Sequence, residues 1–173
     1  MAKEIVFIRH SSLAIPRGVC YGVSNIDVSN NFQLEAEVLK QKLKGYKPDL
    51  VVSSPLQRCL KLAFFTFDTE PQINSDLIEV NYGEWEGRAW TDISVPGNNL
   101  WMYNNINSSP PNGESFSALK QRVVVQLKRL LDSSFDNFNC ISFKFWLIEL
   151  YLFSDSINSF PISSFLFFVF SRF

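Results

Sequence analysis

Histidine is nearly absent from the sequence: its 173 residues contain one, His10. An excess of charge is also lacking, because 16 basic and 17 acidic side chains leave a net charge of -1. Binders of nucleic acid or of polyanionic membranes need a basic surface, so neither partner is expected. The few cysteines, Cys20, Cys59 and Cys140, have no paired metal-ligand spacing. They predict neither a disulfide framework nor a metal site, and they fit a reducing cytoplasm best.

Long apolar runs are scarce as well. Only four strongly apolar residues, at positions 5–8, precede Arg9, too few for the apolar region of a signal peptide. The longest uncharged run in the last 36 residues, residues 156–171, holds 16 residues including Pro161 and several serines. A membrane span requires about 20 apolar residues, so we expect no membrane anchor. The length instead predicts one domain with a sizeable core.

The sequence does contain an alternation of strand and helix patterns. Short β-branched or apolar runs predict buried strands, and apolar residues at helical spacing predict the helices that follow them. The expected elements are strands at 5–8 and 50–52 and helices at 30–44, at 55–67 and from 116 to about 130, the last capped by Ser115. Such alternation predicts an α/β domain with a mostly parallel sheet.

The expected helix at 30–44 is amphipathic. Its apolar positions are Leu34, Val38, Leu39 and Leu43, which stand among charged residues. Gly45 follows as a C-terminal stop. The spacing favours a helix with an apolar stripe toward the core.

Polar residues gather where the two predicted strands end. Arg9 and His10 follow the first strand, while Ser53, Ser54 and Arg58 lie at the exit of the second strand and in the first turn of its helix. In open α/β sheets, ligands bind beyond the carboxyl ends of the strands. Two arginines and a helix N-terminus there favour a phosphate group. A neutral imidazole beside it can attack phosphorus and form a phosphohistidine, which makes His10 the candidate nucleophile.

A leaving alcohol would need a proton, and Glu79 is the candidate donor because it opens a loop rich in glycine and tryptophan. Glu84 and Glu86 lie nearby and are its rivals. Ser53 and Ser54 are interpreted as turn and cap residues, because the sequence offers no second histidine to activate a hydroxyl.

These residues resemble the histidine phosphatase superfamily over roughly residues 4 to 137. The resemblance rests on four ordered motifs, which are Arg9-His10, the segment 53–58, Glu79 with the segment 82–87, and the turn 111–115. Within the superfamily, the segment 18–22 followed by Asp27 is most similar to alpha-ribazole phosphatases, which act in the assembly of the cobalamin nucleotide loop.

The resemblance implies a three-layer phosphoglycerate mutase-like domain, no cofactor and a small phosphorylated substrate such as alpha-ribazole 5'-phosphate. It implies that His10 is the phosphorylated residue, Arg9 and Arg58 are phosphate clamps, Glu79 is the proton donor, and Tyr21 and Gly22 contact the substrate.

The chain departs from the family pattern after residue 137. The family has a further strand there, followed by a second histidine that binds the transferring phosphoryl group, and no histidine follows here. Residues 138–173 hold ten of the 17 phenylalanines and four charged residues, against 29 charged residues in the first 137. We therefore predict a histidine phosphatase core at 1–137, and at 138–173 an aberrant tail, produced by a lost reading frame, that leaves the fold incomplete.

Three functions stay open on these grounds. The first is a metal-independent phosphomonoester hydrolase, with a phosphoglycerate mutase-like phosphotransferase as its close neighbour. The second is a phosphate-binding pseudoenzyme that lacks turnover, because a positive donor aimed at the phosphoryl group is missing. The third is a truncated remnant with unpaired strand edges.

Overall fold

The computed structural model describes residues 3–93, 106–132, 137–141 and 162–168, with the side chains of residues 3, 4, 131, 137–141 and 162–168 left aside. Its strands are β1 (Lys3–Ile8), β2 (Leu50–Ser53), β3 (Gln72–Ile73), β4 (Asn137–Ile141) and β5 (Ile162–Phe168). Its helices are α1 (Phe32–Lys42), α2 (Gln57–Thr66), α3 (Trp90–Ile93) and α5 (Phe116–Leu131), with short 3-10 turns η1 (Ser75–Leu77) and η2 (Gly83–Trp85). The predicted strands and long helices are thus confirmed, although α1 and α2 are slightly shorter than predicted.

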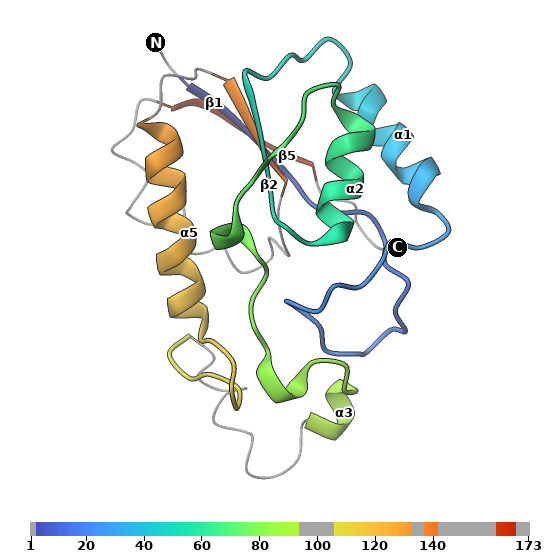
Figure 1. Ribbon diagram of the computed structural model, residues 1–173, viewed down its shortest axis with the longest axis vertical. Helices are drawn as coiled ribbons and strands as arrows, with labels where there is room; N and C mark the ends of the chain where they lie inside the picture. The colour runs from blue at the N-terminus through green and yellow to red at the C-terminus, as the bar shows by residue number, and fades with distance from the viewer. Residues whose placement is uncertain (1–2, 94–105, 133–136, 142–161, 169–173) are drawn as a thin grey trace.

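The described strands form one sheet in the order β3-β2-β4-β1-β5, and every pairing is parallel. Figure 1 shows α5 on one side of this sheet and α1 with α2 on the other. Alternate residues of β1 serve the two faces: Ile5 and Phe7 pack in the core with α5, whereas Val6 and Ile8 pack in the core with α1 and α2. A strand covered on both faces must be apolar at every position, which explains the continuous run. The expected three-layer α/β architecture is confirmed.

The buried stripe of α1 differs from the one expected. Leu39 and Leu43 are buried as predicted, but Leu34 is 72% exposed and Val38 is 43% exposed. Ala36 takes their place, fully buried in the core that α1 shares with α2. Residues 36, 39 and 43 follow one helical stripe, and the small alanine lets the two helices approach closely.

The helix ends follow local chemistry. Ser115 is the N-cap of α5, and its hydroxyl accepts a hydrogen bond from the Ala118 N–H, as predicted. Gly45 has a φ of +86° just beyond α1, a conformation that favours glycine. Pro55 lies just outside α2, whose N-cap is Leu56.

The sheet continues past the predicted boundary at residue 137. β4 lies between β2 and β1, and β5 pairs with the other side of β1. The segment predicted to be aberrant thus supplies two of the described strands, while its origin in a lost reading frame stays a prediction. Within the described ranges, no helix is long and apolar enough to cross a membrane.

Candidate active site

The carboxyl ends of β1 and β2 lie at the same level of the sheet. Both Ile8 of β1 and Ser53 of β2 pair with Ile141 of β4. The two strand ends are therefore two strand spacings apart, about 10 Å. The loop that carries Arg9 and His10 begins at one end, and the turn into α2 begins at the other. The register brings these two predicted motifs to one place.

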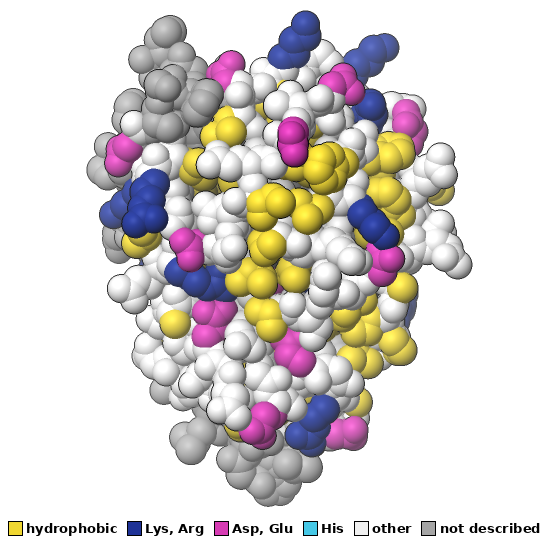
Figure 2. All heavy atoms as spheres, viewed as in Figure 1, with side chains coloured by type: hydrophobic (Ala, Val, Ile, Leu, Met, Phe, Trp, Pro, Cys, Tyr) yellow, Lys and Arg dark blue, Asp and Glu magenta, His cyan; other side chains and the backbone are white. Residues whose placement is uncertain are grey.

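His10 is buried, with 3% of its surface exposed. Its Nδ1 lies 2.7 Å from the carbonyl oxygen of Ser11. A carbonyl oxygen can only accept, so Nδ1 carries the proton of that hydrogen bond. In the neutral imidazole this places the lone pair on Nε2, which is the tautomer a nucleophile at Nε2 requires. On the face drawn in Figure 2 no histidine reaches the described surface, in keeping with this burial.

Arg58 is the second residue of α2, and its side chain is entirely buried. One terminal nitrogen donates to the carbonyl oxygen of Ser24 at 2.8 Å. The other donates to the carbonyl oxygen of Gly22 at 2.6 Å and to Oε2 of Glu79 at 2.8 Å. The guanidinium carbon also lies 5.8 Å from the centre of the Tyr21 ring, a cation–π distance. Arg58 therefore does not face bulk solvent, a placement that would argue against a phosphate role.

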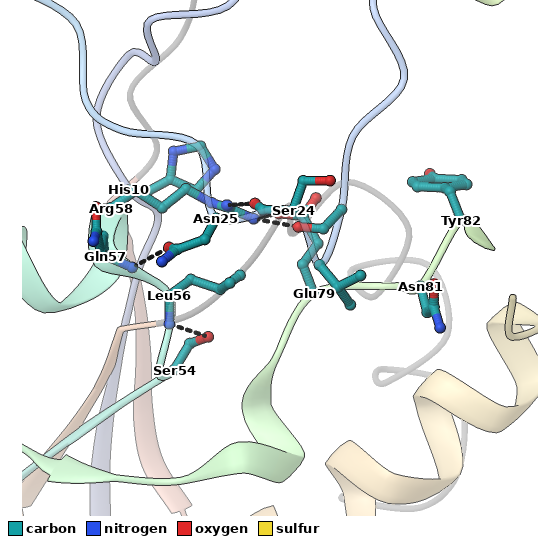
Figure 3. A network of polar contacts seen from close by, with 12 residues as sticks. His10, Ser24, Asn25, Ser54, Leu56, Gln57, Arg58, Glu79, Asn81 and Tyr82 are labelled. Carbon is teal, nitrogen blue, oxygen red and sulfur yellow. Dashed lines mark hydrogen bonds and ion pairs between the residues drawn. The ribbon is translucent and has the colours of Figure 1, made fainter. Parts of the chain in front are cut away.

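Glu79 is 1% exposed and forms a buried ion pair with Arg58 (Figure 3). The two residues come from α2 and from the loop after η1, 21 positions apart in the chain. Sequence reasoning selected both, as a phosphate clamp and a proton donor, but did not predict that they bind each other.

The rivals of Glu79 have other roles in the fold. The carboxylate of Glu84 is exposed and accepts from the side-chain amide of Asn112 at 2.8 Å. Glu86 is half-buried, and its carboxylate accepts hydrogen bonds from the backbone N–H groups of residues 22, 23, 24 and 82 at 3.0 to 3.2 Å and from the hydroxyl of Ser24. Glu79 is thus the one of the three that lies against Arg58.

Glu86 is a positioning residue that sequence reasoning missed. It fixes the loop 22–24, and the carbonyl groups of Gly22 and Ser24 in that loop hold Arg58. The sequence marked Glu86 only as a rival of Glu79 for the role of proton donor. Its positioning role could not be predicted, because the four N–H groups that it binds come from two loops about 60 positions apart.

Arg122 on α5 is a second residue that was missed. It donates to the carbonyl oxygen of Glu79 at 3.2 Å and to that of Asp76 at 2.6 Å. It also forms an ion pair with Glu114 at 2.6 Å. Because Glu114 in turn accepts from the N–H of Asn81, α5 clamps the backbone on both sides of Glu79.

The remaining predicted residues lie in the segments next to His10 and Arg58. Arg9 is half-buried directly after β1, and Tyr21 is buried against Arg58. Gly22 is required by packing, because a Cβ there would lie 1.8 Å from the carbonyl oxygen of Val80. Ser53 and Ser54 are buried turn residues: the hydroxyl of Ser53 donates to the Ser54 carbonyl, and that of Ser54 accepts from the backbone of the α2 N-cap. Their predicted turn role agrees with these bonds.

Burial raises the pKa of the Tyr82 phenol, and the negative charge of Glu79 raises it further. The phenol therefore stays protonated at any physiological pH. Among the described residues no group of three histidine, cysteine or acidic side chains is placed to hold a metal ion. The chemistry within reach of these residues is therefore an imidazole, a guanidinium and a carboxyl group that act on an anion.

Comparison with known proteins gives a consistent result. The model of the histidine phosphatase superfamily (branch 1) matches residues 5–140. A curated adenosylcobalamin/alpha-ribazole phosphatase from Escherichia coli (strain K12) is 31% identical over 102 residues, which are 56% of this chain and 50% of the relative. A glucosyl-3-phosphoglycerate phosphatase from Mycolicibacterium vanbaalenii is 29% identical over 119 residues, 65% of this chain and 53% of the relative. The chain thus spans about half the length of these two relatives.

A solved structure agrees with the fold. The crystal structure of the alpha-ribazole phosphatase from Shigella flexneri has a TM-score of 0.76 to this chain, at 26% identity, over 84% of this chain and 76% of that chain. The phosphoglycerate mutase-like architecture that the motifs implied is confirmed.

Proposed function

We propose a phosphomonoesterase activity for this chain because it belongs to the histidine phosphatase superfamily (branch 1). The reaction has two steps. The Nε2 of His10 attacks the phosphorus of a phosphomonoester, the alcohol leaves, and water then hydrolyses the phosphohistidine. A covalent intermediate divides one difficult transfer into two easier ones.

The observation that carries the proposal is the hydrogen bond between Nδ1 of His10 and the carbonyl oxygen of Ser11. It fixes the plane of the ring and the tautomer that makes Nε2 nucleophilic. Because the ring is buried and held at the end of β1, the nucleophile needs little reorganisation before attack.

The neighbouring charged groups take the roles that the motifs suggest. Arg9 and Arg58 neutralise the negative charge of the phosphoryl oxygens, and a positioned donor of this kind contributes about 10²- to 10³-fold to the rate. Glu79 gives its proton to the oxygen of the leaving alcohol, a step worth about 10²- to 10⁴-fold. Tyr21 and Gly22 border Arg58 and contact the rest of the substrate.

For the substrate we propose alpha-ribazole 5'-phosphate or a similar nucleotide-like monoester. The support is the likeness to two alpha-ribazole phosphatases, one curated and one solved. A second relative is named a glucosyl-3-phosphoglycerate phosphatase. The test therefore compares the hydrolysis of both phosphomonoesters directly. We also propose a cytoplasmic location, which suits the reduced, buried thiols of Cys20 and Cys59.

The test is hydrolysis of alpha-ribazole 5'-phosphate, glucosyl-3-phosphoglycerate and 3-phosphoglycerate by the purified chain, with release of inorganic phosphate as the readout. We expect kcat/KM to be highest for the first. His10→Asn should abolish release, and Glu79→Gln should reduce it. Equal release by the His10→Asn variant would exclude the phosphohistidine mechanism, and conversion of 3-phosphoglycerate to its isomer would assign a mutase.

One observation favours a second candidate function, a phosphate-binding pseudoenzyme. The chain has a single histidine, so a second imidazole cannot help to bind the transferring phosphoryl group. In this function Arg9, His10 and Arg58 hold an anion without turnover. Saturable binding of inorganic phosphate by a chain that releases none from any of the three esters would assign it.

We further propose that a shifted reading frame produced residues 138–173. A central parallel strand is usually a near-continuous run of valine, isoleucine and leucine. β4 lies between two neighbours but reads Asn-Phe-Asn-Cys-Ile. Sequencing the gene should find, in another frame after codon 137, a continuation with a histidine; its absence from both alternative frames would overturn the proposal.

A further inference from the structure

Three N–H donors of Arg58 are committed to groups of the chain. A guanidinium has five N–H donors. The nitrogen that binds Glu79 uses its second hydrogen on the Gly22 carbonyl, and the other terminal nitrogen binds the Ser24 carbonyl. A phosphoryl group held by a two-point fork needs two neighbouring N–H groups. A phosphoryl group that forks onto the two terminal nitrogens of Arg58 therefore competes with the Glu79 carboxylate for an N–H group.

The same ion pair conflicts with the role of Glu79 as a proton donor. A donor must be protonated, whereas a guanidinium 2.8 Å away stabilises the ionised carboxylate. Both side chains are buried, so solvent screens this attraction little. While the ion pair is intact, Arg58 cannot use all its N–H donors on a phosphoryl group. Glu79 also cannot carry the proton that a donor needs.

We propose that the Glu79 carboxylate is an internal stand-in for the substrate phosphoryl group, which displaces it from Arg58, so that anion binding drives Glu79 to take up the proton it later donates. This inference rests on the proposed function. The proton comes from solvent and forms an O–H bond on the Glu79 carboxylate, and no other covalent bond changes. The incoming dianion both takes the N–H of Arg58 and repels the carboxylate, and each effect favours the protonated form of Glu79.

The surroundings suit an exchange at this position. The main chain of Glu79 is held by Arg122 through its carbonyl group, so the side chain can turn while the backbone stays fixed. Arg58 stays anchored by the Gly22 and Ser24 carbonyls after Glu79 leaves. The carboxylate thus leaves without unfolding either element.

Other titratable groups near this site could also take up a proton. Tyr82 interacts electrostatically with Glu79, Tyr21, Cys20 and Glu86, and His10 belongs to the polar network drawn in Figure 3. Phenols and thiols ordinarily carry their protons at neutral pH, and Glu86 is held by backbone N–H groups. His10 is the one competitor for the proton that the experiment must separate.

The test uses inorganic sulfate, a tetrahedral dianion that does not itself titrate near neutral pH. Isothermal titration in two buffers of different ionisation enthalpy measures sulfate affinity and proton uptake together. The wild-type chain should take up about one proton more per bound sulfate than Glu79→Gln. Glu79→Gln should bind sulfate roughly tenfold to a hundredfold more tightly, the factor expected when a hydrogen bond to a charged competitor is lost. Glu84→Gln, an exposed carboxylate in the same loop, should bind as the wild type does.

A Glu79→Gln affinity equal to or weaker than that of the wild type would overturn the proposal. If that variant does not fold, the His10→Asn chain supplies the test: its sulfate affinity should fall as the pH rises, and a pH-independent affinity would overturn the proposal. Failure of the proposed phosphomonoesterase function can be told apart from failure of this inference. In the first case the chain hydrolyses no ester, while sulfate still displaces Glu79 from Arg58.

Discussion

The buried ion pair predicts a large cost for removing one partner. Arg58→Met takes away the guanidinium and keeps an apolar side chain of similar length. The variant leaves the Glu79 carboxylate buried at 1% exposure without this cation, and it removes the donor from two backbone carbonyls. Breaking a buried pair in this way costs about 3–5 kcal/mol. Since domains of this kind are stable by about 5–15 kcal/mol in total, the loss is about a fifth of the whole or more.

The assay is urea unfolding of four chains: the wild type, Arg58→Met, Glu79→Gln and the double variant. Neutralising the carboxylate removes the buried charge that Arg58→Met leaves behind. The double variant should therefore lose less stability than the sum of the two single losses, by about 0.5–3 kcal/mol, the coupling expected between residues in contact. An Arg58→Met chain within about 1 kcal/mol of the wild type, or strictly additive effects in the double variant, would refute the buried pair.

Three further predictions concern the loops around the site. Glu86→Gln removes one of two carboxylate oxygens that hold four N–H groups and should lower the free energy of unfolding by about 1–3 kcal/mol, while the exposed Glu84→Gln stays within about 0.5 kcal/mol. Gly22→Ala puts a Cβ 1.8 Å from a backbone oxygen and should cost about 1–3 kcal/mol, and a melting temperature equal to that of the wild type would contradict it. The hydrogen bond from Lys61 holds the pKa of Asp27 below 3.8, so Asp27→Asn should be less stable than the wild type at neutral pH. That difference should vanish as the pH falls through the lowered pKa, and a difference that persists in acid would contradict it.

Elements with local signals were predictable from the sequence. The apolar run of β1 and the serine cap of α5 are set by neighbouring residues, and both are confirmed. The buried stripe of α1 was partly wrong because a leucine and a valine look more buried than an alanine when only composition is considered. In the structure, Leu34 and Val38 face away and Ala36 packs against α2, which depends on where the second helix lies.

The site was predictable in its members but not in its contacts. His10 and Arg58 were selected by type and by their place after strands, which is where α/β domains bind ligands. Glu79 was selected because it opens a loop rich in glycine and tryptophan. Their roles stay predictions. The ion pair, the clamp by Arg122 and the loop held by Glu86 join residues 8 to 64 positions apart, so no local pattern could reveal them.

The most direct test of the phosphohistidine mechanism is to trap the intermediate. The purified chain is mixed with a radiolabelled phosphomonoester, quenched in alkali within the first turnover and digested, and the labelled peptide is identified. We predict an acid-labile, alkali-stable label on the peptide that contains His10, and none in the His10→Asn variant. Unlabelled protein during measurable ester hydrolysis, or a label that survives in His10→Asn, would contradict the mechanism.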